Sequence, residues 1–180
     1  MYLALDFKTC LFLSAFSIVS MLTNAQELSG GLELGMPLSK SDNNSFGIGG
    51  TVRYEGPWGN QTSLMIDGGI ISFSGKTVGT TSFPTLTMVP IQVGVKYYFD
   101  DPSSGLYVTG QAGIHFISVA PASEKDFGLA PGIGYHLERV DVGMRFQTIF
   151  GSANESYNFI GVRCAYILSE KKSFRSRRRR

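Results

Sequence analysis

The 180-residue sequence is poor in the residues that most often carry chemistry, with two cysteines, two histidines and one tryptophan. Cys10 lies in an N-terminal segment that we expect to be removed, so the mature chain keeps Cys164 alone and forms no intrachain disulfide. The two histidines, His115 and His136, have no neighbouring ligands at a zinc-binding spacing. We therefore expect no metal site, no cofactor and no disulfide framework.

Long hydrophobic runs are also missing, because no window beyond the N-terminus reaches the ~18 apolar residues of a membrane-spanning helix. The first segment has Lys8 before an apolar run at 11–22, followed by the small-residue triplet at 23–25. This pattern predicts a secretory signal peptide at 1–25, cleaved before Gln26. An N-terminal anchor helix is the alternative, which the shortness of the run disfavours.

Basic charge is scarce in the body of the chain. Residues 26–168 carry eight Lys/Arg and twelve Asp/Glu, a net charge of 8 − 12 = −4, whereas residues 169–180 carry seven basic and one acidic residue, a net charge of +6. The negative net charge of residues 26–168 argues against a nucleic-acid partner. The basic tail at 169–180, which we expect to be disordered, is compatible with binding anionic lipid or nucleic acid, and equally with having no role.

Period-two alternation is what the sequence does contain. Within 127–137 every second residue is apolar, and the residues between are nearly all small. After Glu138-Arg139 the alternation resumes in opposite phase over 140–150, which predicts a hairpin of two strands. Both exceed the ~5–6 residues usual in soluble sheets and match the ~9–11 of a tilted membrane strand.

Similar alternation predicts six more strands. They cover residues 27–38, 45–54 and 62–75, a stretch that ends at residue 99, and residues 106–118 and 158–168. The phase changes within 62–75, so we expect a bulge near Gly68-Gly69. Pro90 is expected near the start of its strand or at a bulge. Eight antiparallel strands predict an all-β, up-and-down transmembrane β-barrel as the single domain at 26–168.

The composition of the two strand faces decides what each face meets. Small residues mixed with a few opposite charges suit a crowded polar interior, so the apolar face is interpreted as lipid-facing. A soluble, secreted lipocalin-like binding barrel with the faces exchanged is the alternative. Rings at the strand ends predict two aromatic belts. We place Tyr54, Trp58, Tyr97, Tyr107 and Tyr135 in the belt at the short turns, and Phe46, Phe73, Phe116, Phe127 and Phe150 in the belt near the long loops.

An eight-stranded barrel has an interior just wide enough for its own side chains, so we expect a filled lumen rather than a pore. Inward-facing charges are expected to neutralise one another in a buried network, since unpaired charges are costly there. The network is predicted to comprise Glu33, Arg53, Asp67, Lys96, Asp141, Arg145 and Arg163. Within it, we expect Arg145 and Arg163 to share carboxylates, with Glu33 and Asp141 as partners.

No catalytic residues are predicted. A lipid-modifying acyl hydrolase or acyltransferase, the competing hypothesis, needs a histidine with a serine and an orienting acid. Ser118 lies three residues from His115 and therefore faces the other side of the strand. His136 has Asp141 across its hairpin but no suitable serine. The sequence thus favours a protein that is not an enzyme.

Four stretches carry a resemblance to a known family: PIQVGVKYYF, GLYVTGQAGIHF, PGIGYHLERVDVGMRFQ and NFIGVRCAYIL. They resemble the small bacterial outer-membrane protein β-barrel domain family, whose size is OmpX-like. The resemblance covers the mature chain to Leu168 and implies a cell-envelope protein of the bacterial outer membrane. Outer-membrane lipids and the barrel-insertion machinery are then the expected partners. Such barrels usually end on an aromatic residue, whereas Leu168 stands at that position here.

The loops are the expected sites of contact with an unidentified ligand. They are predicted at residues 39–44, 75–84, 120–126 and 151–157, between the strands that the long links join.

Overall fold

A computed structural model describes residues 27–38, 44–78, 80–101, 104–119, 122–151 and 156–169 of the chain. Their regular structure consists of β-strands. No helix among these residues has the length and apolar character needed to cross a membrane. The predicted signal peptide at 1–25 and nearly all of the basic tail lie outside the described residues.

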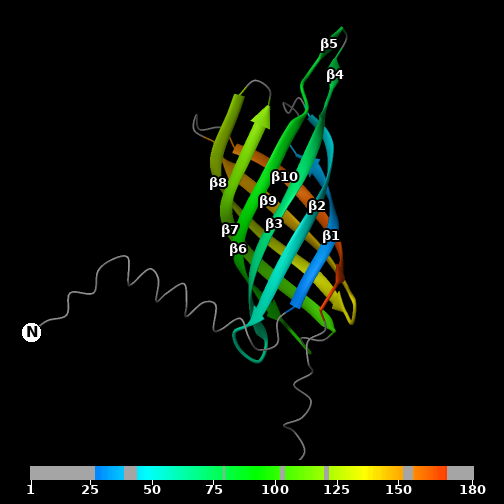
Figure 1. Cartoon of the computed structure of the whole chain (residues 1–180), viewed down its shortest axis with the longest axis vertical. Helices are drawn as coiled ribbons and strands as arrows, with labels where there is room; N and C mark the ends of the chain where they lie inside the picture. The colour runs from blue at the N-terminus through cyan, green and yellow to red at the C-terminus, as the bar shows by residue number, and fades with distance from the viewer. Residues whose placement is uncertain are drawn as a thin grey trace, which may run out of the picture.

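Eight long antiparallel strands close into one barrel (Figure 1). Around the barrel their order is β1-β10-β9-β8-β7-β6-β3-β2, so the first and last strands pair and close the sheet. This confirms the predicted fold class. The strands are β1 (Glu27–Pro37), β2 (Asn44–Pro57), β3 (Thr62–Gly75), β6 (Leu86–Tyr98), β7 (Gly105–Val119), β8 (Ala122–Leu137), β9 (Val140–Phe150) and β10 (Ser156–Ile167).

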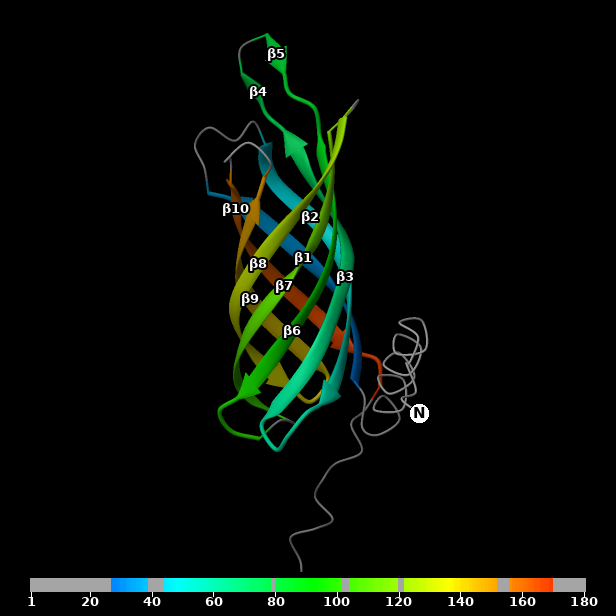
Figure 2. The same cartoon turned by 90° about the vertical axis from the view of Figure 1, so that its left-hand side faces the viewer.

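The two ends of the barrel differ. At one end, here called the turn end, short links join β2 to β3, β6 to β7 and β8 to β9. At the other, the loop end, a separate two-stranded hairpin of β4 (Thr77–Val78) and β5 (Thr81–Ser82) projects beyond the barrel (Figure 2). The loop predicted at 75–84 therefore has a short sheet of its own.

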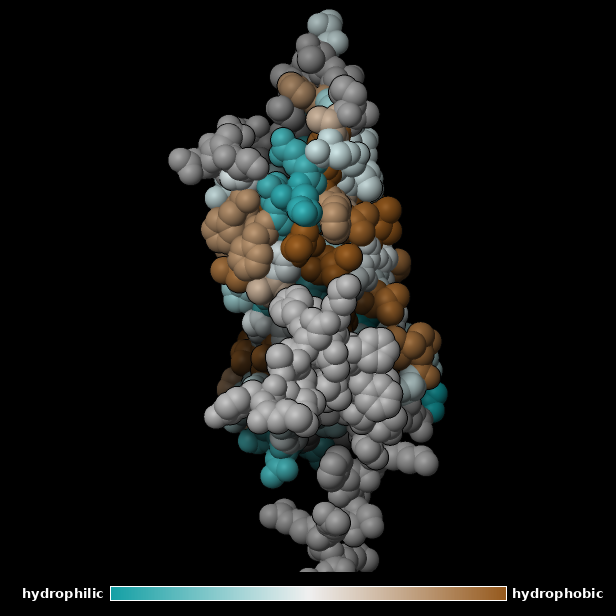
Figure 3. All heavy atoms as spheres, turned by 60° about the vertical axis from the view of Figure 1, so that its left-hand side comes forward, coloured by the Kyte–Doolittle hydropathy of each residue, from teal (hydrophilic) through white to brown (hydrophobic). Residues whose placement is uncertain are grey.

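Side chains are distributed inside out relative to a soluble protein. Among the described residues, thirty-three large hydrophobic side chains are exposed, while nineteen polar or charged side chains are buried. The strand alternation produces this directly, because successive side chains point to opposite faces of the wall. Figure 3 shows apolar residues gathered along the barrel wall, with hydrophilic residues above and below them.

Two predicted strand limits are wrong. β2 extends to Pro57 instead of ending at residue 54, and β8 begins at Ala122 and so covers most of the predicted loop at 120–126. In that hairpin, residues 116–119 of β7 pair with residues 122–125 of β8. Exposed polar residues lengthen the hairpin at the loop end, where the apolar alternation that marks the wall has already stopped.

The bulge expected at Gly68-Gly69 is absent. β3 keeps one register with β2 from Gly47↔Phe73 to Pro57↔Ser63, and the register shift lies between Asn44 and Gly47 instead. Consequently Ile71 and Phe73 keep the phase of Asp67 and point inward, both fully buried. Phe73 is therefore not part of the loop-end aromatic belt, contrary to the prediction. The apolar residues of β3 change phase because the interior of the barrel becomes apolar near the loop end, while the pairing register of the strand stays the same.

Apolar side chains fill the interior near the loop end and form what we call the apolar plug. Phe73 packs edge-to-face against Phe159, with ring centroids 5.2 Å apart. Side chains from both halves of the barrel meet in this cluster. The plug comprises Ile71, Phe73, Leu86, Met88, Ile149 and Phe159.

Pro90 is neither at the start of its strand nor at a bulge. It lies inside β6, where pairing with β7 continues without interruption through Pro90↔His115. On the other side, the β3–β6 pairing runs to Gly68↔Ile91 and resumes at Ile71↔Met88. The gap faces β3 because proline has no N–H to donate to that ladder.

Candidate functional site: a charged barrel interior

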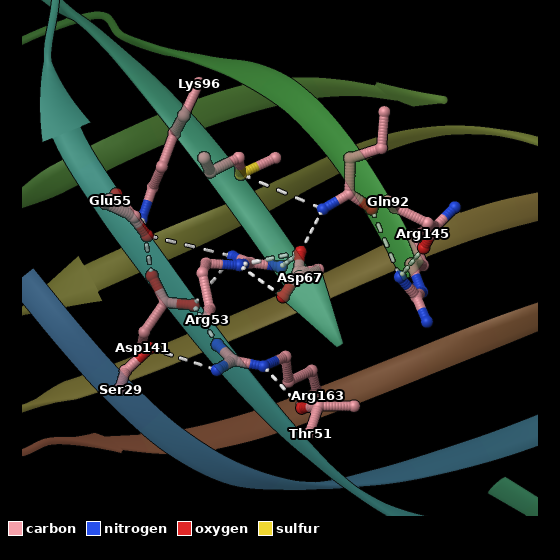
Figure 4. A network of polar contacts seen from close by, with 12 residues as sticks. Ser29, Thr51, Arg53, Glu55, Asp67, Gln92, Lys96, Asp141, Arg145 and Arg163 are labelled. Carbon is pink, nitrogen blue, oxygen red and sulfur yellow. Dashed lines mark hydrogen bonds and ion pairs between the residues drawn. The ribbon is translucent and has the colours of Figure 1, made fainter. Parts of the chain in front are cut away.

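The structure places all seven charged residues of the predicted network inside the barrel, where each is less than one-tenth exposed. They come from β1, β2, β3, β6, β9 and β10, and most of them face one another across the lumen (Figure 4). Their contacts are described as three groups and the separate partners of Arg163, and Asp141 lies within ion-pair distance of Lys96, Arg53 and Arg163.

The first group joins β2 to β3. Arg53 donates from Nε to both carboxylate oxygens of Asp67, at 3.1 and 3.0 Å, and its Nη2 lies 3.0 Å from Oδ2. The two residues are directly opposite in the β2–β3 register. Gln111, from β7 across the lumen, also donates to Asp67. Because the fork of a guanidinium matches a carboxylate, this pair is held in a fixed geometry.

The second group surrounds Lys96, which is fully buried. Its Nζ donates to Glu55 Oε1 at 3.0 Å and to Asp141 Oδ2 at 2.8 Å. The same Nζ lies 3.9 Å from the centroid of the Tyr107 ring, and the Tyr107 hydroxyl donates to Asp141 Oδ1 at 2.9 Å. Tyr98 donates to the other oxygen of Glu55 at 3.2 Å. Two carboxylates and an aromatic face thus compensate the ammonium for its lost hydration.

The third group links β1 to β9 across β10. Arg145 donates from Nε to Glu33 Oε1 at 2.8 Å and from Nη2 to Oε2 at 3.0 Å. Its Nη1 donates to the side-chain oxygens of Gln92 and Gln111, at 2.7 and 3.1 Å. The Gln111 amide connects this group to Asp67, so the first and third groups form one hydrogen-bonded network.

Arg163 has its own partners. Its guanidinium donates to Asp141 Oδ1 at 3.3 Å, to Thr51 Oγ1 at 2.9 Å and to Ser29 Oγ at 3.0 Å. The predicted acids are therefore the ones used, Glu33 for Arg145 and Asp141 for Arg163. The two arginines do not share a carboxylate, because each acid is turned towards a different part of the lumen.

Several members of the network were not predicted. Glu55 lies just beyond the strand predicted at 45–54, although it follows Arg53 by two residues and so continues the inward phase of β2. Uncharged partners such as Gln92 and Gln111 carried no sequence signal beyond their inward phase, since their role depends on which strands face each other across the lumen.

Four of the five aromatic residues predicted for the turn-end belt have exposed or partly exposed side chains, and the fifth is buried. Trp58, Tyr97 and Tyr135 are exposed on the outer wall and Tyr54 is partly exposed there, whereas Tyr107 is only 2% exposed and lies inside. Tyr107 shares the phase of Gln111, so the alternation itself places it inward. Its ring fits because the inward positions Gly134 and Gly143 leave the space that it occupies.

Both histidines lie inside the barrel. His136 lies between two carboxylates, with Nδ1 3.5 Å from Asp141 Oδ2 and Nε2 3.8 Å from Glu27 Oε2, and it is 2% exposed. His115 is fully buried near the plug. Among the described residues, no three His, Cys, Asp or Glu side chains are grouped so that they could hold a metal ion.

A cavity of about 20 Å³ lies among Arg53, Arg145 and Arg163 in the described part of the barrel. A cavity of that size accommodates about one water molecule. Buried charged side chains occupy the middle of the barrel beside this cavity, and the apolar plug occupies its loop end.

The sequence matches no protein-family model, and comparison with curated proteins finds no match. Solved structures, in contrast, share the fold. Neisserial surface protein A matches at a TM-score of 0.56 and 15% identity, covering 79% of this chain and 94% of that one. The N-terminal β-barrel domain of Pseudomonas aeruginosa OprF matches at 0.52 and 11% identity, covering 80% and 98%.

Yersinia pestis Ail, solved in complex with the heparin analogue sucrose octasulfate, matches at a TM-score of 0.51 and 11% identity, covering 81% of this chain and 99% of that one. The match spans nearly the whole length of each solved barrel. The fold implied by the sequence resemblance is thereby confirmed.

Proposed function

We propose that this protein is a non-enzymatic β-barrel of the bacterial outer membrane, with its loop end available for interactions and its lumen closed. The inside-out distribution of side chains carries the proposal. Exposed apolar patches on soluble monomers rarely exceed a few hundred Å². Here Leu32, Met36 and Phe46 are each more than 60% exposed, and they belong to an apolar wall that the barrel displays on its described strands.

A soluble lipocalin-like barrel would require the opposite arrangement. Such a barrel holds its ligand in an apolar cavity, and its outer face is hydrated. In this protein the middle of the lumen holds Arg53, Lys96, Arg145 and Arg163 with their acids, and the outer face is apolar. The shared fold with solved outer-membrane barrels supports the same choice.

Lipid-modifying catalysis is the competing function, and the surroundings of His136 speak against it. Its neighbours Glu27 and Asp141 are acids, and its ring lies inside the wall instead of facing lipid. An acyl transfer site needs a nucleophile within hydrogen-bond reach of the base. Mass spectra of lipids from cells with and without the protein test this: a reproducible mass shift that His136→Ala abolishes would establish an enzyme.

The loop end offers the surfaces that we assign to interaction. The β4–β5 hairpin projects beyond the wall, and the β7–β8 hairpin has an exposed tip at residues 122–125 (Figure 2). Loops on a rigid barrel vary without disturbing the wall, which suits recognition. Insertion by the barrel-insertion machinery is part of the same proposal.

Cys164 provides a direct test of the lipid-facing wall. It is exposed on β10, where it pairs with Leu32 on one side and Val142 on the other. In folded protein reconstituted into vesicles, we expect a charged maleimide to leave Cys164 unlabelled until the barrel is unfolded, because the reagent does not enter lipid and a thiol in hydrocarbon does not ionise. Folding is checked by the change in gel mobility between unheated and heated samples.

Ser123→Cys in a Cys164→Ser background is the matched control, because Ser123 is exposed at the β7–β8 tip beyond the wall. The charged reagent should label this cysteine readily. Equal labelling of both positions by the charged reagent, or recovery of a monodisperse protein without detergent, would contradict the membrane location.

A further inference from the structure

Lys125 on β8 is the only charged side chain in the outward phase of the described barrel strands, the phase that carries the exposed apolar residues. Its neighbours in the chain, Glu124 and Asp126, are in the inward phase, and Asp126 is buried. Lys125 has no ion pair with an acid among the described residues. A lysine on the outer face of a membrane barrel is tolerated near the headgroups but is costly at the bilayer centre. Lys125 therefore marks a place where an anion from outside the protein can bind.

Three phenylalanine rings lie beside Lys125 on the same face of the wall. Phe116 of β7 is its direct partner in the strand register. Phe127 follows it by two residues and stacks on Phe150 of β9, with ring centroids 6.4 Å apart and the ring planes 16° from parallel. All three rings are roughly half-exposed. Because aromatic rings at the ends of lipid-facing strands lie where hydrocarbon meets headgroups, Lys125 is at headgroup depth.

Two hydroxyl groups follow on the same face, one step nearer the tip of the β7–β8 hairpin. Ser118 and Ser123 are opposite each other in the register, and Ser123 Oγ donates to Ser118 Oγ at 3.3 Å. The Ser118 hydroxyl keeps its own proton for another acceptor. About 7 Å of strand separates Ser123 from Lys125. Figure 3, which brings the β7–β8 side of the barrel forward, shows hydrophilic residues directly above apolar ones.

We propose that this face of the β7–β8 hairpin binds the headgroup of an anionic, phosphate-bearing lipid in the leaflet at the loop end. The inference rests on the proposed membrane location. The Lys125 ammonium donates to the phosphate, a charge-assisted hydrogen bond, and the two serine hydroxyls bind headgroup oxygens farther from the hydrocarbon. The acyl chains lie against Phe116 and Phe127. Rings below a cation match a lipid better than a soluble anion, which has no apolar part to contact them.

The hairpin holds these groups in place before a lipid arrives. Pairing of β7 with β8 runs without interruption to Val119↔Ala122, beyond the two serines. Binding therefore orders few side chains, which keeps its entropic cost low.

Quenching of a tryptophan by brominated lipid measures which headgroup occupies the site. The full mature chain carries Trp58→Phe and Phe116→Trp, which removes the one natural tryptophan and places another next to Lys125. It is reconstituted into mixtures of phosphatidylglycerol and phosphatidylcholine in which one lipid or the other has brominated chains. A lysine near anionic lipid contributes roughly a fivefold preference. We expect phosphatidylglycerol to be preferred about fivefold beside the introduced tryptophan.

Lys125→Gln should reduce this preference to about one. Glu124→Gln is the matched control, because it changes the charge of the same hairpin on the other face and should leave the preference unchanged. Phe46→Trp, used instead of Phe116→Trp, reports from exposed β2 wall on the opposite side of the barrel, where we expect no preference. The change in gel mobility on heating verifies that each variant is folded.

An equal preference at the two tryptophan positions, or one that survives Lys125→Gln, would overturn the proposal. S118A/S123A should lower the preference about twofold, and an unchanged value would remove the hydroxyls from the site. If neither brominated lipid quenched the tryptophans, the membrane location would fail and this proposal with it. The labelling of Cys164 identifies that case independently.

Discussion

The guanidinium of Arg145 on β9 reaches the carboxylate of Glu33 on β1 by passing over Gly161 of the intervening strand β10. A Cβ at Gly161 would lie 2.5 Å from Glu33 Oε1 and 3.3 Å from Arg145 Cγ. In the register, Glu33 faces Arg163 on β10, yet its carboxylate binds Arg145, one strand further. Because Gly161 has no side chain, the carboxylate of Glu33 can bind Arg145 instead of Arg163, its neighbour in the register.

Gly161→Ala should destabilise the barrel by roughly 1–3 kcal/mol, the usual cost of overpacking. The added methyl must displace either the carboxylate or the guanidinium. Stability is measured as the temperature at which the compact gel band is lost. Gly110→Ala is the matched control, because nothing lies within 4 Å of its Cβ position. Equal effects of the two substitutions would mean that the pair does not pass over Gly161.

Removing one member of the Glu33–Arg145 pair should cost about 3–5 kcal/mol, because the remaining charge stays buried without its partner. Glu33→Met and Arg145→Met are each expected to lower the gel-band transition temperature strongly. The double variant should recover much of the loss, since two apolar side chains replace two charges. Additive losses in this double-mutant cycle would show that the two side chains do not interact.

Tyr107→Phe removes a hydroxyl that donates to a buried carboxylate, so it should destabilise the barrel by about 1.5–3 kcal/mol. Tyr97→Phe provides the comparison, because Tyr97 donates to Gln61 at 3.3 Å on the exposed outside. We expect the Tyr97 variant to unfold at the wild-type temperature. If Tyr107→Phe did so as well, Tyr107 would belong to the outer belt.

The plug and the charged network should close the lumen independently. Phe159→Ala should cost roughly 3–5 kcal/mol as a large-to-small substitution in a packed core. It should nevertheless produce no ion conductance in planar bilayers, since the charged network still fills the barrel below it. Phe146→Ala, on the outer wall, is the size-matched control. Conductance that appears with Phe159→Ala alone would identify the plug as the sole barrier.

Sequence alternation is sufficient to assign the side chains of residues 127–137 in β8 to their faces, because a period of two leaves only two choices of phase. It failed where the interior changes character. The hydrophobicity of Phe73 suggests a lipid-facing side chain, but Phe73 is part of the plug. Tyr107 is predicted in the outer belt, although it alternates with the inward-facing residues of its strand and is buried. Hydrophobicity identifies the outer wall only where the inside is polar.

Pairings across the lumen were harder to predict. The chain supplies the acids and the arginines, but the strand tilt and stagger of a closed barrel decide which of them meet. Arg53 and Asp67 are neighbours in a hairpin register and could be inferred from it. Lys96 meets Asp141 from strands that are not adjacent, and no local pattern carries that information.

Closure of β1 on β10 has a kinetic consequence. Ser29 and Arg163 are 134 positions apart, and Glu33 and Arg145 are 112 apart, so these contacts require the first and last strands to be together. Contacts between such distant parts of a chain form late, because the entropy of closing the loop is lost before they stabilise anything. We therefore expect Arg145 and Arg163 to remain hydrated until β10 docks against β1. The pairing of β1 with β10 and the loss of water from the lumen would then be a single, cooperative event.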